Sequence, residues 1–218
     1  GLIKQTAARV NTGLGLLDPV LADAIADAAG RVASGEVDEH FPVDVFQTGS
    51  GTSSNMNANE VIAALARETG VTVHPNDHVN MSQSSNDVIP TAIHLAAALG
   101  LEECLWPGVE HLIATIHLRA AELEGVTKTG RTHLMDAMPL TFAQELGAWA
   151  FQLSEGLARL DDALPRLYAL PQGGTAVGSG INAHPDFARL FAEQLTGQTG
   201  LPLTETRNHF AAQASLDV

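Results

Sequence analysis

The sequence predicts an all-α protein, and three observations support this fold class. Hydrophobic residues make up 45% of the 218 residues, while aromatic residues make up only 5%. A core of Leu, Val, Ile and Ala is therefore expected, and such a composition favours helices over a β-sandwich or barrel. Apolar residues recur at intervals of three and four along most of the chain, which is the period of one helix face. Residues that typically begin and end helices flank these stretches.

Two helices are predicted at the start of the chain. Across Ile3–Leu17 the apolar residues are separated by steps of four, three, four and three, which places them on one helix face. Asp18 and Pro19 are typical of the N-cap and first residue of a second helix. Gly35 is typical of a residue just beyond its end. The stretch Val37–Phe46 has no helical period and is predicted to be a loop.

The sequence pattern in the middle of the chain predicts one short helix and one long helix. The short helix covers about Ser54–Thr69 and is closed by Gly70, and an extended segment, Val71–Val73, follows it. Across Val88–Gly125 the pattern is apolar and helical. Pro107 is expected to kink this long helix, because proline removes a backbone hydrogen bond.

A second long helix is predicted to open at Thr141. Gln144 stands three residues further on and completes a capping box. Across Phe142–Leu167 the apolar residues recur in nearly heptad steps, the packing signature of a helix bundle or coiled coil. The Gly-rich stretch Gly173–Gly180 breaks the helical pattern, and another helix is expected over about residues 185–197.

The composition excludes several classes of function. The formal net charge is −14 and no Lys/Arg patch exists, so neither nucleic acid nor an anionic membrane surface is an expected partner. Cys104 is the single cysteine, which excludes an intrachain disulfide and a multi-cysteine zinc site. It is expected to be a small buried hydrophobic residue. No signal peptide opens the chain and no uninterrupted apolar run approaches about 18 residues, so a cytoplasmic location is expected.

Four polar blocks are the strongest indication of chemistry, and each stands where a helix is predicted to start: Gln47–Asn57, His74–Asp77, Ser82–Asp87 and Lys128–Leu134. A helix N-terminus presents unpaired N–H groups and the positive end of the helix dipole, which suits a carboxylate or phosphate. Ser, Thr and Asn side chains add neutral donors, and His133 adds a group that can exchange a proton near pH 7. Together the blocks predict a site for a small anion that undergoes acid–base chemistry.

Each block alone has an ordinary structural explanation, as a turn or a helix cap. Gly173–Gly180 lacks the Gly-Lys-Ser/Thr ending of a phosphate loop, so a nucleotide site is rejected there. His133 has no His or Glu partner at metal-ligand spacing, so general acid–base work is a better interpretation than a metal site. An anionic ligand would meet a repulsive field in so acidic a chain, so local donors must hold it.

Five stretches resemble class II (iron-independent) fumarase, a member of the fumarase/aspartase superfamily: Gln47–Asn59, His74–Asn80, Ser82–Pro90, Gly130–Pro139 and Gly173–Asn182. Three residues take the fumarase form at positions where aspartases differ, and these are His133, Ser85 and His74. The resemblance runs along the whole chain but covers about half of the family's usual length, without the C-terminal part. Leu216–Val218 also resembles the opening of a further helix, so the chain is expected to be a piece of something longer.

The resemblance implies a fumarase/aspartase-type fold with the long helices of a central helical bundle. Residues 1–83 would form an N-terminal helical domain that is incomplete at its start. Residues 84–218 would form the first part of the bundle domain. The resemblance further implies a homotetramer whose active sites are shared between subunits, and the near-heptad pattern of Phe142–Leu167 needs such a partner to cover it.

The function that the resemblance implies is the reversible hydration of fumarate to L-malate, a reaction of the tricarboxylic acid cycle, without metal or organic cofactor. His133 would be the catalytic residue that helps to deprotonate the water. The residues that would bind the small dicarboxylate substrate are Ser50, Gly51, Thr52, Ser84, Ser85, Asn86 and Thr132. The family's mobile Gly-Ser-Ser loop, which takes the other proton, has no counterpart in this sequence. These 218 residues alone are therefore expected to be inactive.

A second, non-catalytic dicarboxylate site is implied at His74, Pro75, Asn76 and Asp77. The sequence departs from the family there, because Gly70-Val71-Thr72 stand where a basic residue is common. Two alternatives to fumarase stay open. One is another superfamily lyase that releases fumarate, such as aspartase, and the other is a non-catalytic helical structural protein.

Overall fold

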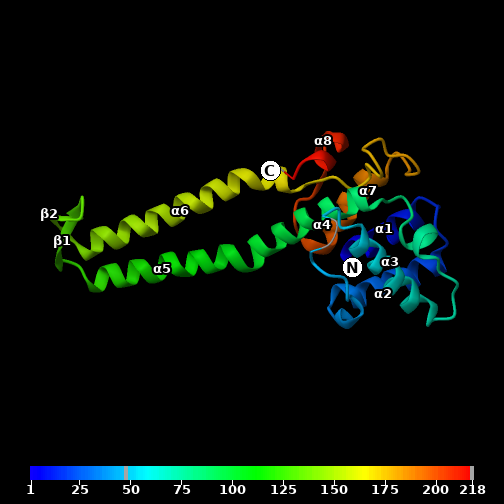
Figure 1. Ribbon diagram of the computed structural model, residues 1–218, viewed down its shortest axis with the longest axis horizontal. Helices are drawn as coiled ribbons and strands as arrows, with labels where there is room; N and C mark the ends of the chain where they lie inside the picture. Colours follow the sequence, from blue (N-terminus) through cyan, green and yellow to red (C-terminus); the bar gives the residue numbers. More distant parts are fainter. Residues whose placement is uncertain (47–48, 217–218) are drawn as a thin grey trace. The chain divides into compact units, whose positions relative to one another are not determined.

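The computed structural model describes residues 1–46 and 49–216, and helices make up most of it (Figure 1). It confirms the predicted all-α fold class. Contacts between residues separate two compact units, the first formed by Gly1–Ala96 with Leu167–Val218 and the second by Ala97–Arg166. The domain boundary expected between residues 83 and 84 stays a prediction, because these units reflect contacts within this chain alone.

The first unit combines helices from both ends of the chain. Its described helices are α1 (Leu2–Gly13), α2 (Pro19–Ala33), α3 (Thr52–Arg67), α4 (Ser85–Gly100, which continues into the second unit), α7 (Phe187–Thr199) and α8 (His209–Ala214). It also includes a 3₁₀ turn (Asp38–His40), a π-helical turn (Pro75–Val79), and two short parallel strands, β3 (Ala169–Leu170) and β4 (Thr204–Glu205).

The capping predicted for α2 is confirmed. The carboxylate of Asp18 accepts hydrogen bonds from the backbone N–H groups of Val20 at 2.9 Å and Leu21 at 3.3 Å. These bonds satisfy donors that the first turn of a helix leaves unpaired. The helix ends at Ala33, before Gly35, whose φ of +78° lets the chain leave the helix.

The prediction that the first helix continues to Leu17 was wrong, because α1 ends at Gly13. Gly15 adopts a φ of +72°, and the carbonyl of Asn11 accepts from the N–H groups of Leu16 and Leu17. This turn closes the helix and returns Leu17 to the core, where it is buried. The helical spacing of apolar residues in the sequence therefore extends beyond the last residue of the helix itself.

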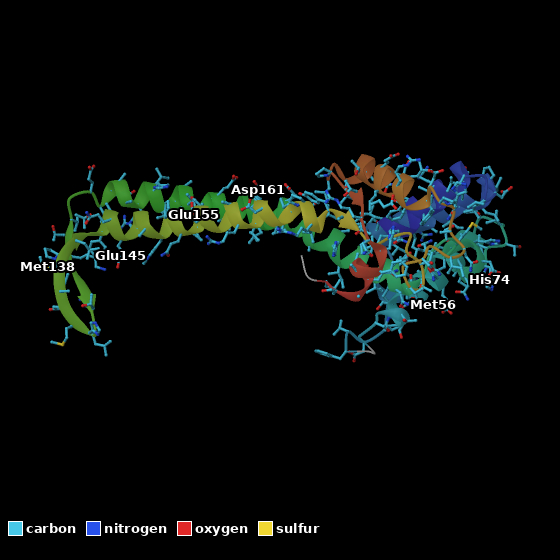
Figure 2. The ribbon with its side chains drawn as sticks, turned by 90° about the horizontal axis from the view of Figure 1, so that it is seen from above. Met56, His74, Met138, Glu145, Glu155 and Asp161 are labelled. Carbon is cyan, nitrogen blue, oxygen red and sulfur yellow. The ribbon has the colours of Figure 1, made fainter. Side chains whose placement is uncertain are left out.

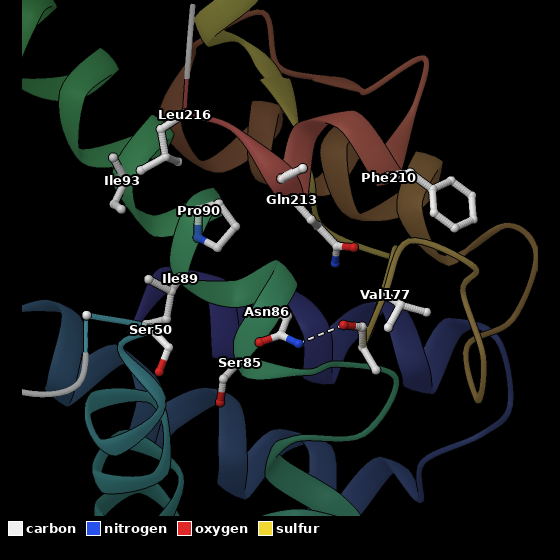
Figure 3. A pocket seen from close by; sticks show the side chains of 13 residues that line it. Ser50, Ser85, Asn86, Ile89, Pro90, Ile93, Val177, Phe210, Gln213 and Leu216 are labelled. Carbon is white, nitrogen blue, oxygen red and sulfur yellow. Dashed lines mark hydrogen bonds between the residues drawn. The ribbon is translucent and has the colours of Figure 1, made fainter.

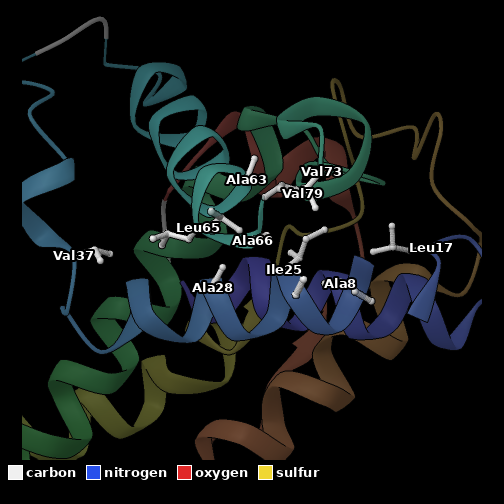
Figure 4. Close-up of a cluster of buried hydrophobic side chains, with 14 residues drawn as sticks. Ala8, Leu17, Ile25, Ala28, Val37, Ala63, Leu65, Ala66, Val73 and Val79 are labelled. Carbon is white, nitrogen blue, oxygen red and sulfur yellow. The ribbon is translucent and has the colours of Figure 1, made fainter. Parts of the chain in front are cut away.

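The core of the first unit packs between α1, α2 and α3 (Figure 4). Ile25 and Ile62 are completely buried, and Val73 and Val79 join them. Most of the other buried positions in this cluster are alanines: Ala8, Ala22, Ala24, Ala28, Ala29, Ala63 and Ala66. Small side chains let helix axes approach closely, so little is left unfilled between the three helices. The expected core of Ala, Leu, Val and Ile is confirmed here.

The segment after α3 is not a strand. α3 begins at Thr52, two residues before the predicted start, and ends at Arg67. Val71–Val73 pairs with no strand in the described part of the chain. The guanidinium Nε of Arg67 donates instead to the carbonyl of Val73 at 2.8 Å. A side chain thus satisfies the backbone oxygen that a strand partner would otherwise take.

A long helical run continues from Ser85 through α4, a π-helical turn (Leu101–Leu105) and α5 (Trp106–Glu122). Pro107 lies in the first turn of α5, just after the π turn, so the predicted interruption occurs beside it. Cys104 is exposed in the π turn, so its predicted burial was wrong. The run Ser85–Glu122 has a mean hydropathy of 1.4 over its most apolar window and could cross a membrane by length and composition, a property shared by core helices of soluble proteins.

The second unit is built from α5, a β-hairpin and α6 (Phe142–Leu167), and α5 and α6 run side by side in both Figure 1 and Figure 2. The hairpin pairs β1 (Thr127–Thr132) with β2 (Met135–Thr141) in antiparallel register. The expectation that Lys128–Leu134 precedes a helix directly was therefore wrong. The three Thr residues of β1 suit a strand, and pairing with β2 satisfies backbone groups of both strands.

The capping box that opens α6 is confirmed. The side chain of Gln144 accepts from the N–H of Thr141 at 2.9 Å, and the hydroxyl of Thr141 accepts from the N–H of Gln144 at 3.1 Å. The near-heptad face of α6 is only partly covered within the chain. Trp149 is 52% exposed, and Leu112 on α5 is 46% exposed.

The end of the chain differs from its prediction. The Gly-rich loop before α7 is irregular, as expected. The last described helix, α8, ends at Ala214, and Ser215 has an extended backbone. Leu216 is not helical, and the remainder of the predicted helix opening, Asp217 and Val218, lies outside the described residues.

Candidate functional site

The first predicted donor block lies at the start of α3. Gly51 is the N-cap with a φ of +68°, and the hydroxyls of Ser50 and Thr52 lie 3.2 Å apart. A Cβ at residue 51 would lie 2.7 Å from the side chain of Ile89, so this turn needs glycine for both its conformation and its space. The neighbouring Gln47 of this block lies outside the described residues.

The second donor block lies at the start of α4. The hydroxyl of Ser84 accepts from the N–H of Asn86 at 3.3 Å. The side-chain amide of Asn86 donates to the carbonyl of Ala176 in the Gly-rich loop at 2.7 Å. The hydroxyl of Ser85 accepts from the side-chain amide of Asn55, on α3, at 2.8 Å. These contacts connect the two blocks and the Gly-rich loop.

The two blocks meet at a cavity of about 470 Å³, which Ser50, Ser85 and Asn86 line (Figure 3). Its other walls are mainly apolar, and they were not predicted as part of the site: Ile89, Pro90, Ile93, Val177, Phe210 and Leu216. Such side chains look like ordinary core or surface residues in a sequence, so no signal identified them. A mostly apolar cavity with a few donors is typical of a small-molecule site.

Ser84 lies on a second, more polar cavity of about 550 Å³, which Ser85 also lines. Asn76 and Asp77 of the predicted second dicarboxylate site line this cavity as well. His74 precedes them as the N-cap of the π-helical turn, where its Nδ1 accepts from the N–H of Asp77 at 3.1 Å. Asp77 is exposed, and its carboxylate would oppose a dianion there.

Thr132 and His133 belong to the second unit, at the tip of the β-hairpin. His133 and Leu134 form its two-residue turn, with φ values of +50° and +62°. Turns of this kind favour Asn and Gly, so two larger side chains in the left-handed region carry conformational strain. The His133 side chain is exposed. Within the described residues no group of three or more His, Cys, Asp or Glu could hold a metal ion.

Lys128, at the base of the hairpin, is already paired. Its Nζ donates to both carboxylate oxygens of Glu145, at 2.7 and 2.6 Å, and lies 5.4 Å from the ring centre of Phe142. This ion pair is half-buried and connects β1 to the first turn of α6. Lys128 thus stabilises the hairpin base.

Two buried charged groups lie beside the donor residues: Lys4, and Asp87, the last residue of the Ser82–Asp87 block. No role was predicted for either of them from the sequence. Lys4 is 2% exposed and Asp87 is completely buried. The Asp87 carboxylate accepts from the N–H groups of Ser84 at 2.8 Å, Gly173 at 3.0 Å and Thr175 at 2.8 Å. Asp87 therefore holds the start of α4 and the Gly-rich loop together.

Burial is the largest influence on the pKa of both groups. It raises the pKa of Asp87 to about 6, against the three backbone hydrogen bonds and the positive charge of Lys4, which act to lower it. Burial likewise lowers the pKa of Lys4 to about 7, although the Asp87 carboxylate acts to raise it. The sequence signal was weak, because a lysine beside an apolar helix face normally extends into solvent.

Comparison with known proteins supplies the context for this geometry. The chain matches the family model described as lyase over residues 1–218. Class II fumarate hydratase of Xylella fastidiosa is 56% identical over 218 residues, which are 100% of this chain and 46% of the relative. The chain thus spans about half the length of the curated relatives it matches.

Two solved structures are closely similar. Recombinant class II fumarase from Schistosoma mansoni has a TM-score of 0.93 at 39% identity, covering 97% of this chain and 49% of that one. A fumarate lyase:delta crystallin from Brucella melitensis has a TM-score of 0.91 at 42% identity, covering 97% of this chain and 47% of that one. These likenesses confirm the expected fumarase/aspartase-type fold.

Proposed function

Because the chain belongs to the lyase family, we propose that the protein containing it is a class II fumarate hydratase. The reaction adds water across the double bond of fumarate and gives L-malate, without metal or organic cofactor. The observation that carries this proposal is the cavity where Ser50, Ser85 and Asn86 meet. Neutral donors on one side of an apolar cavity suit a small carboxylate.

Ser50 and Ser85 bind a substrate carboxylate through their hydroxyls in this proposal. Asn86 keeps one amide hydrogen on the carbonyl of Ala176 and has a second hydrogen left for the ligand. Gly51 and Thr52 complete the first block. Ser84 and Thr132 are also proposed to bind the substrate. Hydroxyl and amide donors carry no positive charge. Their hydrogen bonds must therefore hold the anionic ligand against the repulsion of a chain with a net charge of −14.

His133 is the group that moves a proton of the attacking water. In the dehydration direction, removal of a proton beside a carboxylate converts that carboxylate into a dianionic aci-form. Donors aimed at the developing charge are each typically worth about 10²–10³ in rate, which explains why the chemistry needs several of them. His133 is exposed on the hairpin turn, and its imidazole makes no hydrogen bond within the described part of the chain.

The second dicarboxylate site at His74, Pro75, Asn76 and Asp77 is proposed as a non-catalytic site. Its support is the polar cavity that Asn76 and Asp77 line. The assembly is proposed to be a cytoplasmic homotetramer with active sites shared between subunits. Its support is the partly uncovered apolar face of α5 and α6, on which Leu112 and Trp149 are exposed.

The deciding experiment uses the full-length protein, meaning this chain with whatever sequence adjoins it. Fumarate and L-malate are each supplied, and absorbance of fumarate in the ultraviolet is followed with and without ammonia. Hydration in both directions without ammonia supports the proposal. Loss of fumarate that depends on ammonia and gives aspartate would assign the protein to the aspartases instead. No turnover of either substrate would favour a structural helical protein.

A further inference from the structure

The hydroxyl oxygen of Ser85 accepts a hydrogen bond from a side-chain amide. The side-chain nitrogen of Asn55 donates to its Oγ at 2.8 Å. An amide nitrogen has no lone pair to offer, so Ser85 can only accept in this contact. The hydroxyl proton of Ser85 therefore points elsewhere, and Ser85 lines both cavities described above.

The direction of the Asn55 amide is set by the next residue in the network. The side-chain oxygen of Asn80 accepts from Lys4 Nζ at 2.9 Å, from Asn59 at 3.1 Å and from Asn55 at 3.3 Å. The side-chain nitrogen of Asn80 donates to the backbone carbonyl of Gln83 at 3.2 Å, so its oxygen faces Lys4 Nζ. Asn55 and Asn59 must then present their NH₂ groups to the same oxygen.

Burial leaves these amides no alternative arrangement. Asn55 is 3% exposed and Asn59 is completely buried. The side-chain oxygens of both have no partner within the described residues. Turning either amide around would place its oxygen against the oxygen of Asn80. Presenting both NH₂ groups to Asn80 therefore leaves these two buried oxygens without a partner in the described part of the chain.

We propose that Asn55 is a positioning residue that forces the Ser85 hydroxyl to donate into the ligand cavity, and that Asn80 and Lys4 fix Asn55 in turn. This inference rests on the proposed function only in taking the ligand to be a carboxylate. A carboxylate can only accept, so a hydroxyl preset as a donor needs no reorientation when the ligand binds. A ligand group that must donate would find no acceptor at Ser85.

The test replaces Asn55 with an isosteric residue of opposite hydrogen-bond direction. In Asn55→Asp the carboxylate accepts from Ser85, which turns the hydroxyl proton away from the cavity. Asn57→Asp is the matched control, because it adds the same charge to α3 two residues away, and the Asn57 side chain donates to the carbonyl of His40 instead of joining the network around Asn80. The variants are made in the full-length protein, and their folding is checked by circular dichroism.

The readouts are KM and kcat for fumarate, and the affinity for succinate by titration calorimetry. Asn55→Asp is expected to weaken succinate binding and raise KM by about ten- to a hundredfold, the range for losing a hydrogen bond to a charged group. Asn57→Asp should change them by less than about threefold. Asn55→Ala leaves the Ser85 hydroxyl free to rotate, so it should lie between the two.

A double-mutant cycle separates positioning from charge repulsion. In a Ser85→Ala background, Asn55→Asp should change succinate affinity by less than about twofold, since no hydroxyl remains to redirect. An undiminished effect in that background would overturn the inference, as would equal losses in Asn55→Asp and Asn57→Asp. Failure of the wild type to bind succinate would overturn it too. A wild type that binds succinate but does not turn over fumarate would refute the proposed reaction. The double-mutant cycle on succinate affinity would then still test the positioning role of Asn55.

Discussion

The two units of this chain hold their predicted site residues in opposite ways. In the first unit, Ser85 is fixed by Asn55 and a buried network that includes Lys4. In the second unit, His133 stands on an exposed hairpin turn. The first unit also has a buried apolar core around Ile25 and Ile62, whereas Leu118 on α5 is 70% exposed. We therefore expect the second unit to depend more on contacts beyond this chain.

The largest expected effect tests whether the two units by themselves suffice for function. These 218 residues alone should show at least about a thousandfold lower turnover of fumarate than the full-length protein, because groups that act as a unit are lost together. The measurement is the ultraviolet assay on both proteins. Turnover by this chain within about tenfold of a typical ~10 s⁻¹ would show that the essential chemistry lies within these residues.

The next effect concerns His133, the exposed member of the site. His133→Asn in the full-length protein should lower kcat by about 10²–10⁴, the usual contribution of a general acid–base group. Affinity for succinate should change by less than about threefold, because His133 serves the water and not the carboxylates.

Chelators provide the control for this assignment. Wild-type turnover should survive treatment with a strong chelator. Unchanged turnover in His133→Asn would refute the acid–base role, and so would activity that is lost with chelator and restored by iron or zinc.

A pair of apolar truncations compares the two units directly. Ile62→Ala, in the buried core, should lower the free energy of unfolding of this chain by about 2–5 kcal/mol. Leu118→Ala should change it by no more than about 0.5 kcal/mol, because most of the side chain is already in water. Denaturant unfolding of the isolated chain measures both.

The same substitution at Leu118 also tests the proposed assembly. In the full-length protein, light scattering should give the mass of a tetramer, and Leu118→Ala should weaken it. A stable full-length monomer whose α5 and α6 amides are well protected from exchange would contradict the idea that the second unit needs a partner.

The smallest expected effect comes from the buried charge of Lys4. Its pKa falls from 10.5 to about 7 on folding, so between these values the unfolded chain binds the proton and the folded chain does not. Stability must therefore rise with pH in this window. The free energy of unfolding should increase by up to about 2 kcal/mol between about pH 7.5 and 9.

Lys4→Met is the control for this pH dependence. The variant lacks the titrating group, so its stability should be flatter over the same range, whatever its absolute value. Denaturant unfolding at the two pH values measures the difference. Equal slopes in the wild type and the variant would show that Lys4 keeps its ordinary titration in the folded chain.

Features that depend on near neighbours were predictable from residue type and spacing. The Asp18 cap and the Thr141–Gln144 capping box are local hydrogen bonds, so residue type and spacing sufficed to predict them. The helical period identified most helices, because a helix face repeats within a few residues. The polar blocks likewise identified Ser50, Ser85 and Asn86, which the structure brings to one cavity.

Features that depend on distant partners became visible only in the folded chain. The β1–β2 hairpin looked like a loop, because strand pairing supplies stability that no single strand shows in sequence. Lys4 looked like a surface residue until Asn80, 76 positions away, was placed beside it. The direction of the Ser85 hydroxyl depends in turn on Asn55, 30 positions away. Hydrogen-bond direction in a buried network is a property of all its members together, so no local pattern can encode it.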